Sequence, residues 1–195
     1  MKHIKGNSYD VVRLIINQLG ISIFALVLYI AMASVGENNP SLHTGLKIAS
    51  SVFSMFFYWM LIYAVMWEIG AKDRIKIDTG KAVDFKPKGL VMGLLANLGC
   101  VALSLVAIGF KVAYLVFGVD GFNTVVLIST VIIRFVSAMY IGLVSGICLP
   151  LTNPDYNDLS QAILYFVLYV LTILVCHFAY TLGKNNFKFF GNKAK

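Results

Sequence analysis

Two cationic side chains lie inside long apolar runs of this 195-residue sequence, and they are the residues best placed to do chemistry there. Lys111 lies near the end of a run that begins at Gly89, and Arg134 lies within the run 122–150. A charged side chain near the middle of a bilayer costs about 2.5–3.5 kcal/mol on insertion scales. Arg134 is therefore either a group that recognises an anion or a residue that snorkels to the outer surface.

Both cations belong to repeating stripes of small and polar residues. One stripe recurs every three or four positions from Gly93 to Lys111, and the other recurs every four positions from Thr130 to Pro150. These spacings place each stripe on one helical face. Each stripe is either a helix-packing seam or one wall of a polar cavity, and we expect the two to face each other. The candidate residues are Asn97, Ser104, Lys111, Arg134, Gly142 and Gly146.

Two further features indicate packing or polar contacts. Gly89 and Gly93 form a GxxxG pair, which lets two helix backbones approach closely. His177 lies near the end of the last apolar run, where hydrogen bonding to a neighbour or an interface group is the expected role. A proton relay through His177 would need a carboxylate inside the membrane, and none is evident in the apolar runs.

Catalytic and metal chemistry lack their usual sequence patterns. The chain has no HExxH motif, no paired carboxylates and no Ser/His/Asp set, and its Asp and Glu residues fall mainly in polar loops. Cys100, Cys148 and Cys176 lie within apolar runs, which is typical of buried thiols. We therefore predict no enzyme activity, no metal site and no cofactor.

The composition predicts an all-α integral membrane protein. Hydrophobic residues make up 59% of the chain and charged residues 13%, against about half and a quarter in soluble domains. The net charge of +7 comes from basic residues beside apolar runs, which favours anionic lipid headgroups over nucleic acid as the partner. We expect one domain, 1–195, with about five transmembrane helices at 14–35, 46–67, 89–116, 122–150 and 161–182.

The polar segment 68–88 fixes the predicted topology. Six of the sixteen Lys and Arg residues lie between Lys72 and Lys88, so the segment should be a basic cytoplasmic loop, with the amino terminus also cytoplasmic. Alternating residues at 75–78 and 82–85 flank Thr79-Gly80-Lys81. That pattern predicts a short β-hairpin on the membrane surface, and the alternative is a solvated loop.

The carboxyl tail conflicts with five crossings. Five crossings put the tail outside, although it carries Lys184, Lys188, Lys193 and Lys195, while the segment 151–160 carries no Lys or Arg. A re-entrant 122–150 segment would give four crossings and place all basic tracts inside, provided that protein or water covers its non-helical backbone. Both topologies remain open from the sequence.

The segments WEIGAKD, TGK, KGLVMGLLANL and HFAYTLGK resemble small multi-pass membrane proteins of low-GC Gram-positive bacteria that have no assigned function. The resemblance implies a bacterial inner (plasma) membrane protein and transfers no activity or site residue.

Two functions fit these patterns. The first is an accessory or interaction subunit of a membrane complex, or a homo-oligomer, whose small-residue faces bind other helices. The alternative is a transporter or permease component in which Arg134, Lys111, Asn97 and Ser104 line a cavity for an anionic or polar solute.

Overall fold

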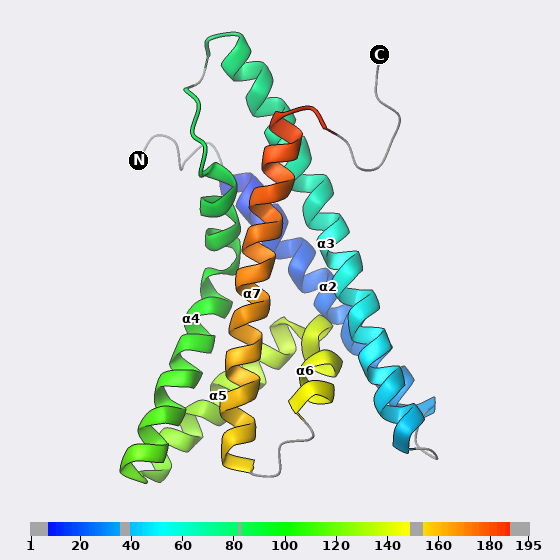
Figure 1. The fold of residues 1–195 in the computed structure, drawn as a ribbon, viewed down its shortest axis with the longest axis vertical. Helices are drawn as coiled ribbons and strands as arrows, with labels where there is room; N and C mark the ends of the chain where they lie inside the picture. The colour runs from blue at the N-terminus through cyan, green and yellow to red at the C-terminus, as the bar shows by residue number, and fades with distance from the viewer. Residues whose placement is uncertain (1–7, 36–39, 82, 149–153, 188–195) are drawn as a thin grey trace. The chain divides into compact units, whose positions relative to one another are not determined.

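The computed structural model describes residues 8–35, 40–81, 83–148 and 154–187, and these segments are almost entirely helical. Some predictions concern segments outside the described residues. These are the basic terminal segments at 1–7 and 188–195 and the end of the predicted helix at 149–150. The helices are α2 (Ser8–Val35), α3 (Pro40–Asp78), α4 (Lys88–Phe117), α5 (Asp120–Val136), η1 (Ala138–Tyr140), α6 (Ile141–Cys148) and α7 (Pro154–Lys184) (Figure 1).

Four helices of the described residues are long and apolar enough to cross a membrane, and a fifth exists only if the bent pair α5 and η1/α6 counts as one span. The prediction of an all-helical chain with several spans is confirmed at this level. α3 has 39 residues and is therefore roughly 58 Å long, against about 30 Å of hydrocarbon in a bilayer. The excess length carries the polar residues that the sequence places in the loop 68–88.

The predicted β-hairpin is wrong, because residues 75–78 form the last turn of α3 and the described residues contain no strand. α3 ends in a Schellman motif, in which the Lys81 amide donates to Lys76 O and the Gly80 amide donates to Ile77 O. Gly80 takes the left-handed conformation that this motif needs, with φ of 69°. An alternation of only four residues is also compatible with a helix, and the glycine is a helix C-cap here rather than a hairpin turn.

The predicted single helix 122–150 is also divided. α5 ends at Val136, and the axis turns by 92° into the η1/α6 pair (Figure 1). The carbonyl of Val136 accepts a hydrogen bond from Ser22 Oγ, and Ser137 Oγ is hydrogen-bonded to Tyr169 OH. Side chains of α2 and α7 thus satisfy polar groups at the break, which a buried interruption of a helix requires.

By internal contacts, the chain divides into two compact units. Unit 1 comprises Met1–Asn17, Trp59–Asn97 and Val170–Lys195, and unit 2 comprises Gln18–Tyr58 and Leu98–Tyr169. The boundaries fall within α2, α3, α4 and α7, so each of these helices contributes one segment to each unit.

Glycines set the packing of unit 1. A Cβ added to Gly70 of α3 would collide with the backbone of α7 at Tyr180, and one added to Gly183 of α7 would collide with the backbone of α3 at Trp67. Gly89 and Gly93 of α4 approach α7 in the same way, with a Cβ at Gly93 only 2.9 Å from Cys176 Cβ. Gly89 and Gly93 therefore lie against α7 of the same chain.

Unit 2 has a tyrosine-rich interior. Tyr140, Tyr165 and Tyr169 are almost completely buried, and the rings of Tyr140 and Tyr169 meet edge to face at 6.2 Å. Gly142 of α6 packs against the backbone of α3 at Lys47, and its amide donates to Ser51 Oγ at 2.7 Å. That bond satisfies an amide in the first turn of α6, where helical partners are absent.

Candidate functional site

Lys111 is the most deeply buried charge in the described residues, with 1% of its surface exposed. It lies on α4 in unit 2. Its ammonium group donates to Asn123 Oδ1 and Asp158 Oδ2, both at 3.3 Å, and lies 5.0 Å from the centre of the Tyr114 ring. A buried charge is tolerated only when it is paired and hydrogen-bonded, and these contacts supply both.

Asp158 pairs with Lys111, but its side chain is much more exposed than that of Lys111. The Asp158 side chain is 45% exposed, whereas the Lys111 side chain is 1% exposed. Asp158 lies in the second turn of α7, near the helix N-terminus, whose dipole favours a carboxylate. The two contacts of Lys111 tie the end of α4 to the starts of α5 and α7.

Arg134 extends from the last turn of α5 toward α7. Its Nη2 donates to Gln161 Oε1 at 2.5 Å, and Gln161 itself is 8% exposed. Within the described part of the chain, no carboxylate forms an ion pair with the Arg134 guanidinium. Since Asp158 is bonded to Lys111, the charge of Arg134 remains without a direct counter-charge there.

A recess of about 200 Å³ lies beside these groups in unit 2. One wall is α5 and the other includes the start of α7. Its lining combines one cation, one carboxylate, three neutral polar side chains and three apolar ones: Arg134, Asp158, Asn123, Thr124, Thr130, Val126, Leu127 and Val131. The recess can therefore hold a small charged group next to an apolar one.

The structure brings together only part of the predicted stripes. Lys111 and Arg134 both belong to unit 2, where Asp158 pairs with Lys111 and lines the recess together with Arg134. Ser104 donates to Cys100 O of its own helix, at 2.9 Å. Asn97 belongs to unit 1 and donates to Gly93 O at 3.0 Å.

Three polar residues of the cluster were not singled out from the sequence: Asn123, Asp158 and Gln161. The predicted last helix begins at 161, but α7 begins at Pro154, which brings Asp158 into the helix. Proline at a first helical position followed by acidic residues in the next turns is a helix-start signal, and it was available in the sequence.

The glycine pairs contact helices of the same chain. Gly89 and Gly93 face α7, whereas Gly142 and Gly146 face α3, with a Cβ at Gly146 lying 2.5 Å from the Ile48 side chain. The second stripe thus packs partly on α3 rather than on the stripe of α4. These four glycines are accordingly occupied by intramolecular packing.

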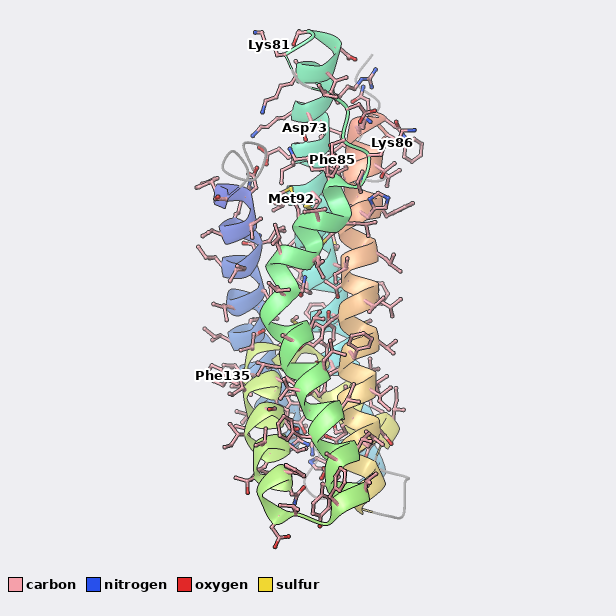
Figure 2. The ribbon with its side chains drawn as sticks, turned by 90° about the vertical axis from the view of Figure 1, so that its left-hand side faces the viewer. Asp73, Lys81, Phe85, Lys86, Met92 and Phe135 are labelled. Carbon is pink, nitrogen blue, oxygen red and sulfur yellow. The ribbon has the colours of Figure 1, made fainter. Side chains whose placement is uncertain are left out.

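Unit 1 contains a second polar cluster. The Asp73 carboxylate, on α3, accepts hydrogen bonds from Lys88 Nζ at 2.6 Å and from Tyr180 OH at 3.1 Å. Asp73 lies inward of Lys81, which marks the tip of the α3–α4 connection (Figure 2). The cluster joins α3, α4 and α7, and we assign it to packing.

His177, the remaining sequence candidate, lies on α7 in unit 1. Its Nδ1 has no hydrogen-bond partner among the described residues, and its Cα faces Gly89. No group of three or more His, Cys, Asp and Glu side chains capable of holding a metal ion occurs in the described segments.

The described helices are compatible with a multi-pass membrane protein. Comparisons give no finer identity, since no protein family, no curated protein and no solved structure matches the chain.

Proposed function

We propose that this protein is a membrane transport component, acting alone or as the membrane part of a complex, that binds an anionic ligand in the recess of unit 2. The observation that carries the proposal is the pairing pattern of the two cations. Lys111 has Asp158 as its counter-charge, while Arg134 lines the recess with no carboxylate paired to it in the described residues. Ionisable residues inside membrane segments mark ligand pathways because burial of their charge is costly.

The divided helix supports the same function. Discontinuous helices are common at the binding sites of transporters, where non-helical backbone lies in protein or lines a water-filled cavity. Here the break at Ser137 is fully buried and bonded to Tyr169, and α5 carries most of the recess.

We further propose four crossings, with α5, η1 and α6 as a re-entrant segment. Lys111 contacts both Asn123 near the start of α5 and Asp158 near the start of α7, and only a short segment joins α6 to α7. The re-entrant segment thus enters and leaves at one side of the membrane.

The basic helix ends indicate which side is cytoplasmic. In unit 1, Lys184 of α7 pairs with Asp84, and Arg13 of α2 pairs with Glu68. Both helix ends therefore belong with the basic segment, which the positive-inside rule puts in the cytoplasm of a bacterial cell.

The accessory-subunit interpretation loses its main support in the structure. It rests on small-residue faces that are free to bind a partner helix, and the four predicted glycines contact α3 and α7 of the same chain. We retain one interaction from the sequence, the binding of anionic lipid headgroups at the cytoplasmic end. Lys76, Lys81 and Lys86 are exposed there, at the end of α3 and in the connection to α4. Arg74 is paired with Asp78 and is not part of this surface. Each cationic side chain near an anionic surface contributes about 1 kcal/mol.

Reconstituted vesicles test the proposal. The purified protein is placed in liposomes, and the movement of labelled phosphate, acetate, glutamate and a fluorescent short-chain phosphatidylglycerol is followed. We expect at least one of these anions to cross faster than in protein-free liposomes, and Arg134→Gln to abolish the difference. Arg74→Gln is the matched control because Arg74 is exposed and lies in unit 1.

Two results would contradict the proposal. One is that no anion of the panel crosses faster than in protein-free vesicles. The other is that the Arg134→Gln and Arg74→Gln variants behave alike. Mass determination of the native complex in mild detergent accompanies the assay, so that a cytoplasmic subunit is retained if transport needs one.

A further inference from the structure

We infer that the ligand of the unit 2 recess is an anionic amphiphile, a phosphate-bearing lipid whose headgroup meets Arg134 and whose chains lie along α5. The inference rests on the proposed anion site and names the chemical class of its ligand. It follows from three properties of α5: an exposed apolar face, a polar lining beside that face, and the position of Arg134 between them.

The exposed face of α5 is apolar over two turns. Leu127 is 66% exposed, Val131 is 57% exposed and Phe135 is 63% exposed. Figure 2 shows Phe135 at the outer edge of the ribbon. These residues recur every four positions, so they form one row about 12 Å long. Leu127 and Val131 also line the recess, which means that the apolar row continues into it.

The polar lining suits a phosphate group. The Arg134 guanidinium can donate two parallel hydrogen bonds to phosphate oxygens, which is the preferred geometry for this pair. Thr130 adds a hydroxyl donor and Asn123 adds an amide to the same lining, whereas the Thr124 hydroxyl donates to Asp120 O. The Asp158 carboxylate would repel an anion bound in the recess, but the Lys111 ammonium pairs with it and offsets its charge.

The size and opening of the recess separate a lipid from a free anion. A volume of about 200 Å³ holds a headgroup but leaves hydrocarbon chains outside. A free anion gains no binding energy from an exposed apolar row beside its charged group. The hydrocarbon chains of an amphiphile do, because they pack against the row and remove apolar surface from water. Charge complementarity and the adjacent apolar row thus select an anionic lipid.

The test measures binding to the full chain purified in mild detergent. The probes are dihexanoyl phosphatidylglycerol, dihexanoyl phosphatidylcholine, glycerol 3-phosphate and inorganic phosphate, each titrated while the unfolding temperature is followed. We expect dihexanoyl phosphatidylglycerol to stabilise the wild type at concentrations at least tenfold lower than any other probe. Arg134→Gln should weaken that probe at least tenfold, Val131→Ser should weaken it severalfold, and Arg74→Gln should leave it unchanged.

The outcomes separate the inference from the proposed function. Equal stabilisation by inorganic phosphate and dihexanoyl phosphatidylglycerol would overturn the lipid inference and leave an anion site that depends on Arg134. Equal stabilisation by phosphatidylcholine, or equal loss in Arg74→Gln, would also overturn it. If Arg134→Gln does not fold, the comparison among the four probes on the wild type decides alone, and stabilisation by none of them rejects the anion site as well.

Discussion

Lys111 and Asp158 form an ion pair in which the ammonium is almost completely buried and the carboxylate is nearly half exposed. The Lys111 side chain is 1% exposed, the Asp158 side chain is 45% exposed, and Nζ lies 3.3 Å from Oδ2. The two partners therefore depend on the pair unequally. Water can solvate the carboxylate when the lysine is removed, but it cannot reach the ammonium when the aspartate is removed.

The first prediction concerns this asymmetry. Asp158→Asn should destabilise the protein by about 3 kcal/mol, because it removes a hydrogen-bonded negative charge from a buried cation. Lys111→Met should cost less than about 1 kcal/mol, because it leaves a partly solvated anion. Thermal unfolding in detergent measures both, and the double variant Lys111→Met/Asp158→Asn should be more stable than Asp158→Asn alone. A larger loss for Lys111→Met than for Asp158→Asn would show that the pair is not arranged as described.

The second prediction concerns the contact between α3 and α7 in unit 1. Gly183→Ala should destabilise the protein by several kcal/mol, since its Cβ would collide with the backbone of α3 at Trp67 and no flexible side chain can move away. Gly99→Ala is the matched control, because no atom outside its own helix lies within 4 Å of the added Cβ. Alanine at position 99 should be neutral or stabilising by up to about 1 kcal/mol. Equal unfolding temperatures for the two variants would exclude the close contact.

The third prediction ranks the contacts of Asp73. Asp73→Asn removes the counter-charge of Lys88 and should cost about 2 kcal/mol, while Tyr180→Phe removes one hydrogen bond and should cost about 1 kcal/mol. Glu68→Gln is the comparison, because its pairs with Arg13 and Lys72 are exposed and should contribute nothing measurable. Thermal unfolding that ranks Glu68→Gln as the most damaging of the three would contradict this assignment.

The fourth prediction concerns the sides of the membrane. A fluorescent reporter fused after Lys195 should report the cytoplasm, and a cysteine at position 81 should react from the same side. A cysteine at position 119, between α4 and α5, should react from the outside. A reporter outside the cell after Lys195 would replace four crossings with five.

Much of the fold follows from apolar runs, because spanning length and composition are local properties of the sequence. The break at Ser137 does not follow from them. It depends on Ser22, Tyr169 and Ser51, which are distant in sequence and satisfy backbone or hydroxyl groups at the break and at the start of α6. A single apolar run of this length contains no signal for those partners.

The two cations of the site can be predicted from the sequence, but their polar partners cannot. Lys111 and Arg134 stand out because charge in an apolar run is costly. Asp158 precedes the last apolar run, so hydropathy alone predicts a loop there, whereas Pro154 begins α7 and brings Asp158 into the helix. The prediction of a β-hairpin is wrong for a related reason. A four-residue alternation followed by glycine is also compatible with a helix end such as that of α3.

The most direct test of the proposed site uses a cysteine at position 124, at the recess. The three native cysteines are buried, so the wild-type protein provides the blank for labelling by a membrane-impermeant thiol reagent in intact cells. We predict that Thr124→Cys is labelled from the outside, and that an anionic probe slows labelling in purified protein only when Arg134 is present. Labelling from the cytoplasmic side, or a rate that the anion does not change, would contradict an externally open anion site beside Arg134.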